Sequence, residues 1–333
     1  MEKALCSVAL LLAAIPLDGR AESPRALPSD RRPNDERRGP PRTLEGFFPF
    51  TPVRSPEDWT ARIEQIRRQI LLSAGLWPMP SKTPLNSVIH GKIDRNEYSV
   101  EKVIFESVPG HFVTGNLYRP KKVLGNGSKI PAVLCPHGHW PKGRFLDQDE
   151  KTVRQELATG AERWETAAHH PLQARCVQLA RMGCIVFHYD MVGYADSIQF
   201  TEHTPTYAYE RAPQLGSDQF FTVDADGRLQ TVFGLQTWNS IRSVDFLLSL
   251  PEVDPHRIGI TGASGGGTQA MILTAIDLRL AASFPCVMVS TAMQGGCTCE
   301  NGHYLRIGMG NIDIAAATAP RPLGMTAADD WTK

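Results

Sequence analysis

The chain has 333 residues, of which 42% are hydrophobic and 21% charged, and its formal net charge is zero. This composition suits one large globular domain, with or without an appendage. The balanced charge gives no indication of nucleic-acid binding, and no apolar run reaches the length needed to span a membrane.

The N-terminus has the pattern of a secretory signal. A short charged start precedes an almost wholly apolar run, residues 4–17, and residues 19–21 form a small-x-small cleavage pattern. We therefore expect residues 1–21 to be a signal peptide and the protein to be secreted or periplasmic. Residues 22–45 are rich in proline and arginine and poor in apolar side chains, which predicts a disordered linker.

Residues 46–333 are expected to form the globular domain, and its first element is a helix. Ser55 is a suitable N-cap, Pro56 suits the first helical position, and acidic residues fill the first turn. The apolar residues keep helical spacing until Gly75, where we expect the helix to end.

Strand signals follow this helix. Residues 98–107 and 112–118 alternate apolar and polar side chains, which predicts an antiparallel pair at the edge of a sheet. The short apolar segments 130–135 and 184–189 are expected to be buried strands. Strands and helices then alternate along the chain, which indicates a mostly parallel central sheet with helices on both faces.

The later elements continue this alternation. Helices are expected at 171–182, 236–250 and 312–319, and strands at 281–290 and 323–328. Two segments interrupt the pattern, one polar at about 144–170 and one rich in aromatic residues at about 194–233. We expect both to be insertions at the rim of the cleft.

The motif on which the other elements depend is G-A-S-G-G at residues 262–266. A short β-branched run, residues 258–261, precedes it, and a helix-compatible segment, residues 268–276, follows. Glycines beside a serine let the backbone take a strained turn that projects the side chain into a cleft. The N-terminus of the next helix favours an anion formed there. G-x-S-x-G between a strand and a helix therefore predicts that Ser264 is a nucleophile.

Two histidine- or cysteine-containing spacings could suggest a metal. Cys297 and Cys299 form C-x-C-x3-H with His303, and His137-x-His139 is a second pair of potential ligands. No further ligand pair at zinc spacing accompanies the first, and no carboxylate is spaced to complete the second. We therefore expect no metal site and no cofactor, and we interpret the other cysteines of the domain as buried thiols.

The order of motifs resembles that of exported bacterial α/β-hydrolases of the acetyl xylan esterase type. Besides the serine turn, the motifs are S-x-P-G (107–110), P-H-G-H (136–139), D-x-x-G-x-x-x-S (190–197) and A-P-R-P…D-D-W (319–331). The resemblance covers about residues 50–333. It implies the α/β-hydrolase fold and a carboxylic ester hydrolase whose substrate is a small-molecule or polysaccharide ester.

The resemblance also implies roles for individual residues. Ser264 corresponds to the nucleophile, and the backbone N–H groups of Gly265 and His139 correspond to the oxyanion hole. Asp330 corresponds to the acid of the triad, with Asp329 as its rival. The implied reaction is a two-step acyl transfer through an acyl-enzyme.

One feature departs from the family pattern. The triad histidine should follow the acid, yet only Trp331, Thr332 and Lys333 follow Asp330. A C-terminal strand and helix are missing as well, so we expect the reading frame to continue and this chain alone to have little activity. The alternative base is His303. Two rival functions stay open, a peptidase of the same fold and a catalytically inactive carbohydrate-binding relative.

Overall fold

The computed structural model describes residues 43–122, 129–140, 142–200 and 223–327, with single residues at 28, 30, 31, 39 and 220. All helices and strands named below belong to one compact unit, Thr43–Lys333. The predicted signal peptide, most of the predicted linker, and both Asp329 and Asp330 lie outside the described residues.

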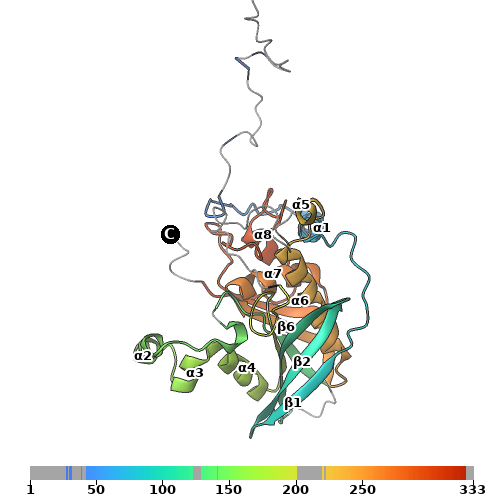
Figure 1. Cartoon of the computed structure of the whole chain (residues 1–333). Coiled ribbons are helices and arrows are strands. Elements are labelled where there is room, and N and C mark those ends of the chain that lie inside the picture. Colours follow the sequence, from blue (N-terminus) through green and yellow to red (C-terminus); the bar gives the residue numbers. More distant parts are fainter. Residues whose placement is uncertain are drawn as a thin grey trace, which may run out of the picture. The chain divides into compact units, whose positions relative to one another are not determined.

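The described residues form a seven-stranded sheet in the order β1-β2-β3-β5-β4-β6-β7 (Figure 1). The strands are Val88–Asp94 (β1), Tyr98–Val108 (β2), His111–Pro120 (β3), Ile130–Leu134 (β4), Ile185–Tyr189 (β5), Val253–Ala263 (β6) and Leu280–Cys286 (β7). The pairings β1–β2, β2–β3 and β3–β5 are antiparallel. The pairings β5–β4, β4–β6 and β6–β7 are parallel.

The sheet is therefore mixed, and the prediction of a mostly parallel sheet was wrong. Short turns join β1 to β2 and β2 to β3, and such turns can connect only antiparallel neighbours. The predicted antiparallel pair is confirmed as β2 and β3, but it does not form the edge. The strand at this edge of the sheet is β1. Six of its seven residues are exposed, so its sequence lacks the alternation of apolar and polar side chains that would predict a strand.

The helices agree closely with the sequence pattern. They are Pro56–Ser73 (α1), Glu150–Thr159 (α2), Glu165–His169 (α3), Pro171–Arg181 (α4), Val223–Gly227 (α5), Val232–Ser249 (α6), Gly265–Ile276 (α7) and Asn311–Ala316 (α8), with a 3-10 turn at Gly143–Phe145 (η2). The start of α1 is as predicted, because Ser55 Oγ accepts a hydrogen bond from the Asp58 N–H at 3.1 Å. Helix α6 begins earlier than predicted, since Thr231 caps it.

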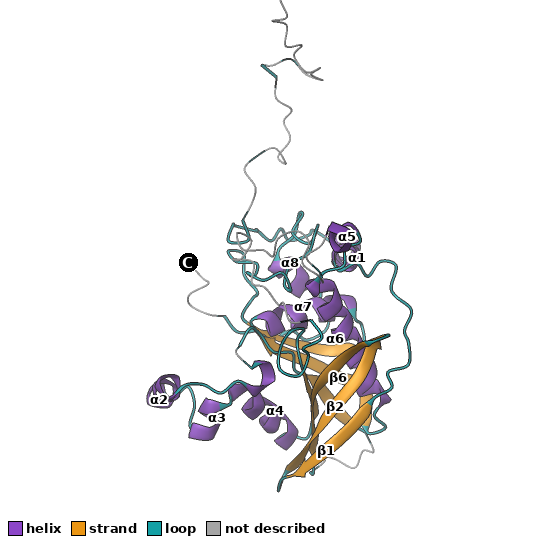
Figure 2. Cartoon of the chain, viewed as in Figure 1, coloured by secondary structure: helices purple, strands orange, loops and turns teal. Residues whose placement is uncertain are grey.

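Helices cover both faces of the sheet. In β5, Ile185, Phe187 and Tyr189 join a core cluster with α1, α6 and α7, whereas Val186 joins a smaller cluster with α4. Successive side chains of a strand point to opposite faces, so the two clusters lie on opposite faces of the sheet. Figure 2 shows α4 on one side of the strands and α6 on the other. The prediction of helices on both faces is confirmed.

The C-terminal part of the described chain extends the sheet. Leu323 and Thr326 form parallel bridges with Ser283 and Cys286 of β7, where the sequence predicted a strand at 323–328. Strand β7 itself ends earlier than predicted, because Val287 and Met288 have positive φ values of 59° and 70° and turn the chain away.

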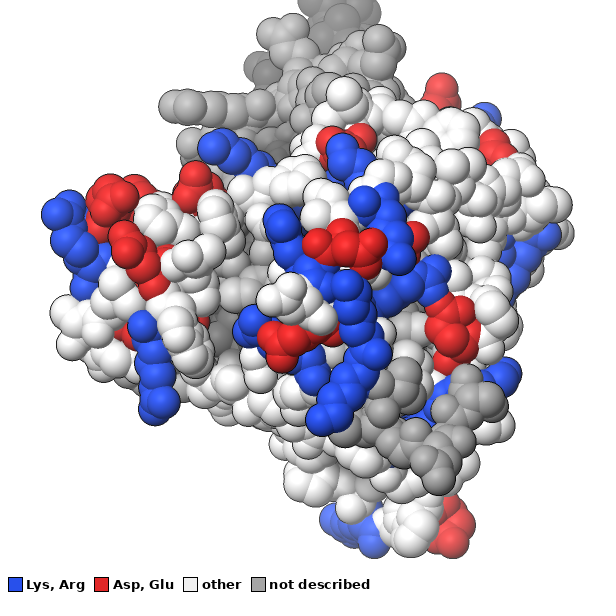
Figure 3. All heavy atoms as spheres, turned by 90° about the horizontal axis from the view of Figure 1, so that it is seen from below, with Lys and Arg blue, Asp and Glu red and all other residues white. Residues whose placement is uncertain are grey.

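The surface carries both signs of charge. Figure 3 shows Lys and Arg side chains interspersed with Asp and Glu on the face it views. Ion pairs join strand ends and helices, for example Lys121 to Asp94 at 3.3 Å and Arg181 to Glu97 at 2.8 Å. Within the described residues, no helix is both long and apolar enough to cross a membrane.

Candidate active site at the turn between β6 and α7

The serine of the G-A-S-G-G motif occupies the sharp turn between β6 and α7. Ser264 has φ 55° and ψ −127°, a backbone conformation that residues other than glycine rarely adopt. Its carbonyl accepts hydrogen bonds from the N–H groups of Gly267 (2.7 Å) and Thr268 (3.0 Å), which starts α7. The Ser264 hydroxyl makes no capping bond to the helix. The backbone of Ser264 therefore begins α7, and its hydroxyl takes no part in capping that helix.

The glycines let three backbone segments meet at this turn. A Cβ on Gly262 would lie 2.4 Å from the Gly266 carbonyl oxygen, and one on Gly266 would lie 2.4 Å from that of Pro136. A Cβ on Gly138 would lie 2.7 Å from Ser264 Cβ. Only glycine fits at these positions, and the loop after β4 therefore lies directly against the serine turn.

His137 holds this loop in place. Its ring is fully buried, and its Nε2 accepts a hydrogen bond from the Met191 N–H at 3.1 Å. The proton therefore lies on Nδ1, which donates to the Gly138 carbonyl at 2.8 Å. His137 thus connects the loop after β4 to the loop after β5. From the sequence, His137 was considered only as a potential metal ligand together with His139. Its hydrogen bonds to the backbone of Gly138 and Met191 could not be predicted from residue spacing.

His139 points to a different part of the structure. A Cβ on Gly265 would lie 2.9 Å from His139 Cε1, so the imidazole ring packs over the residue that follows Ser264. Its Nε2 lies 2.9 Å from Cys299 Sγ. Among the described residues, the potential ligand atoms that come together belong to His139, Cys297 and Cys299, and His137 is not one of them.

His303 is not beside the two cysteines that precede it in the sequence. Its Nε2 contacts the carboxylate of Asp226, and its side chain is 47% exposed. The C-x-C-x3-H spacing therefore does not describe the spatial cluster.

A buried carboxylate completes the surroundings of His139. Glu300 is 3% exposed, and its Oε2 accepts a hydrogen bond from the Cys297 N–H at 3.0 Å. Its Oε1 accepts one from Thr268 Oγ1 of α7 at 3.4 Å. Burial raises the pKa of Glu300. Burial also acts to lower the pKa of His139, but the nearby Cys297 and Glu300 outweigh it and raise that pKa above its ordinary value.

Asp190 stabilises the turn after β5. Its Oδ2 accepts hydrogen bonds from Thr114 Oγ1 (2.6 Å) and from the Asp196 N–H (3.2 Å). The same oxygen contacts the guanidinium of Arg144, which is 1% exposed and also donates to Asp196 Oδ2 at 2.5 Å. The burial of Arg144 could not be predicted from its position at the start of a polar segment.

Comparison with known proteins shows what the chain is similar to. No protein-family model matches the sequence. The chain is 26% identical over 219 residues to the putative hydrolase YtaP of Bacillus subtilis, covering 64% of this chain and 60% of that protein. It is 23% identical over 244 residues to acetyl esterase Axe7A of Xylanibacter ruminicola, covering 70% of this chain and 43% of that protein. The chain thus spans less than two thirds of the length of either.

Solved structures are similar as well. Methylesterase BT1017 superposes with a TM-score of 0.60 at 25% identity, over 84% of this chain and 54% of that one. A putative acetyl xylan esterase from Bacteroides fragilis superposes with a TM-score of 0.60 at 16% identity, over 85% and 72% of the two chains. The chain has the α/β-hydrolase fold and is related in sequence to an acetyl esterase.

The other predicted site residues of this α/β-hydrolase are placed as follows. Gly265 is the first residue of α7, and His139 lies on the loop that faces it. Their backbone N–H groups stay a prediction for the oxyanion hole. Asp330 and its rival Asp329 lie outside the described residues, so the acid also stays a prediction.

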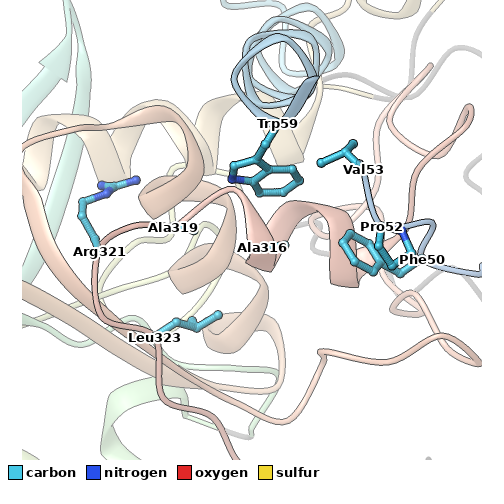
Figure 4. A pocket seen from close by; sticks show the side chains of 8 residues that line it. All are labelled: Phe50, Pro52, Val53, Trp59, Ala316, Ala319, Arg321 and Leu323. Carbon is cyan, nitrogen blue, oxygen red and sulfur yellow. The ribbon is translucent and has the colours of Figure 1, made fainter. Parts of the chain in front are cut away.

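An apolar pocket of the α/β-hydrolase lies elsewhere. It has a volume of about 340 Å³ and is lined by Phe50, Pro52, Val53, Trp59, Ala316, Ala319, Arg321 and Leu323 (Figure 4). These side chains come from the segment before α1, from α1, and from α8 and the residues after it. Ser264 does not line this pocket, so its position gives no support for a substrate site there.

Proposed function

We propose that this α/β-hydrolase is a carboxylic ester hydrolase that uses Ser264 as its nucleophile. The observation that carries the proposal is the Ser264 backbone, held at φ 55° between β6 and α7. Strained conformations of this kind persist where the surrounding structure enforces them and are concentrated at functional sites. The sequence relationship to acetyl esterase Axe7A supports ester chemistry.

In the proposed reaction, Ser264 Oγ attacks the ester carbonyl carbon and forms a tetrahedral intermediate. The alcohol then leaves, and water releases the acid from the acyl-enzyme. The oxyanion would be held by the N–H groups of Gly265 and His139. The first of these lies at the N-terminus of the 12-residue helix α7, where the helix dipole favours negative charge.

The proposed acid is Asp330, with Asp329 as its rival. In the triad order a histidine follows the acid, and the residues given after Asp330 are Trp331, Thr332 and Lys333. The assays below apply to the full-length protein. For the substrate, we propose an acetylated polysaccharide or a related sugar ester.

The test is the Ser264→Ala variant, assayed with p-nitrophenyl acetate and with acetylated xylan. Loss of a triad nucleophile lowers kcat by about 10⁴- to 10⁶-fold, and we expect a loss of this size. The matched control is Ser249→Ala at the end of α6, which should keep full activity. A fluorophosphonate probe should label the wild type at Ser264 and leave Ser264→Ala unlabelled.

Two outcomes would count against the proposal. Wild-type turnover that survives in Ser264→Ala would exclude this serine as the nucleophile. A folded wild-type protein that binds acetylated xylan without hydrolysing any ester would favour a carbohydrate-binding relative. Methyl-esterified sugar acids belong in the same assay, because one similar structure is a methylesterase.

A further inference from the structure

His139, Cys297 and Cys299 bring three metal-binding side chains together from two distant loops. One ring nitrogen of His139 and the two Sγ atoms all lie within 4.8 Å of one another. Within this group, His139 Nε2 is 2.9 Å from Cys299 Sγ. His139 follows β4, and the cysteines lie between β7 and α8, about 160 residues later. Two loops far apart in the sequence thus bring together an imidazole nitrogen and two sulfur atoms, which are potential metal ligands.

We propose that His139, Cys297 and Cys299 bind one thiophilic divalent cation, with Zn²⁺ the expected one. An imidazole and two thiolates are ligands that zinc accepts, and three protein ligands leave a fourth position for water. In a tetrahedral site the nitrogen and sulfur ligands are about 3.5 Å apart and two sulfurs are about 3.8 Å apart. The three ligand atoms lie within 4.8 Å of one another, and binding requires His139 Nε2 and Cys299 Sγ, which are 2.9 Å apart, to separate by about half an ångström.

The residues around His139, Cys297 and Cys299 suit a buried metal site. Cys297 is 3% exposed and Cys299 is 1% exposed, and both contact a small apolar cluster that includes Val192 and Val232. Glu300 fixes the cysteine-bearing loop by accepting a hydrogen bond from the Cys297 N–H. Carboxylates in this outer position orient metal ligands. Burial protects the thiols from exchange with other ligands in solution.

A bound ion would also join two parts of the active-site region. The ring of His139 lies over Gly265, the residue after Ser264, and the cysteines belong to a loop that Glu300 connects to Thr268 of α7. The ion would fix the loop after β4 relative to α7. This inference does not depend on ester hydrolysis, because the direct measurement is metal binding.

The experiment is a titration of the reduced, chelator-treated protein with Co²⁺ and then Zn²⁺. We expect thiolate-to-cobalt charge-transfer bands and the d–d bands of tetrahedral Co²⁺, which saturate at one equivalent and disappear when Zn²⁺ is added. Outer-shell partners alone are worth about 10- to 100-fold in affinity. Glu300→Gln should therefore weaken binding by about that factor, and Cys297→Ser, Cys299→Ser and His139→Gln should weaken it by more than about 100-fold.

Two controls make the test specific. His303→Gln removes the histidine of the C-x-C-x3-H spacing, and Cys184→Ser removes a thiol next to α4, so both should bind Co²⁺ like the wild type. Circular dichroism checks the folding of each variant, and His139→Gln decides the matter if a buried cysteine variant fails to fold. The proposal is overturned if folded wild type shows no tetrahedral Co²⁺ spectrum. It is equally overturned if His303→Gln abolishes binding.

Discussion

Ser264 shows how a single residue can carry a conformational cost that its neighbours impose. Its φ of 55° and ψ of −127° lie where a Cβ atom is crowded by the backbone. Such a conformation costs on the order of 1–3 kcal/mol in a residue other than glycine. Close approach of Gly138, Gly262 and Gly266 to neighbouring backbone leaves the turn no room to relax. The strain should therefore be measurable as a preference for glycine at this position.

Comparison of Ser264→Gly with Ser264→Ala tests this strain, because both variants lack the hydroxyl. We expect Ser264→Gly to have the higher free energy of unfolding, by about 1 kcal/mol or more, since only alanine retains the crowded Cβ. Ser243 inside α6 is the matched control, where glycine should be the less stable variant by about 1 kcal/mol. Urea unfolding of the four variants measures both differences. Equal stability of the two Ser264 variants would contradict the strain.

At the scale of elements, one buried ion pair ties β3, η2 and the turn after β5 together. Asp190 contacts Thr114 of β3 and Arg144 of η2, and it accepts a hydrogen bond from the N–H of Asp196 in its own turn. Both Asp190 and Arg144 are about 1% exposed. Burial lowers the pKa of Arg144, but the contact with Asp196 keeps its guanidinium paired. Removal of one partner leaves a buried charge with less compensation.

Asp190→Ala should therefore lower the free energy of unfolding by about 3–5 kcal/mol, the range for a broken buried pair. Asp190→Asn keeps a hydrogen-bond acceptor and should lose less. Glu97→Ala is the control, because Glu97 pairs with Arg181 on the surface and exposed pairs contribute little. Thermal and urea unfolding measure the three variants. A stability loss in Asp190→Ala no larger than that in Glu97→Ala would show that the pair does not hold these elements.

The elements also show which parts of this structure a sequence can predict. The start of α1 was predictable because Ser55, Pro56 and the first acidic residues act within one turn. Strand β1 was not, because it is exposed on both faces and no alternation marks it. The turn at Ser264 followed from local glycines. The cluster of His139 with the cysteines did not, since its members are about 160 residues apart and meet only through the order of the strands.

At the scale of the whole molecule, buried histidines make the stability of the fold depend on pH. Burial lowers the pKa of His111 to about 4, and its Nε2 accepts a hydrogen bond from Asn239 Nδ2 at 3.1 Å. Burial also lowers the pKa of His188 in β5 well below its usual range, with help from the positive charge of Arg175. Each histidine stays neutral in the folded state at a pH where the unfolded chain would bind a proton. His139, whose pKa is raised, acts in the opposite sense.

The sign follows from proton uptake. Between about pH 6.5 and pH 4 the unfolded state binds more protons at His111 than the folded state does, so stability falls as the pH falls through this range. The loss from His111 is on the order of 2–3 kcal/mol at pH 4.

His111→Gln removes the titrating group, and it should reduce the decline in unfolding free energy between pH 7 and pH 4 by that amount. His90→Gln, on the exposed strand β1, should leave the slope unchanged. Urea unfolding at half-unit pH steps measures the three curves, and a His111→Gln curve parallel to the wild type would show that burial of His111 does not cause the acid sensitivity.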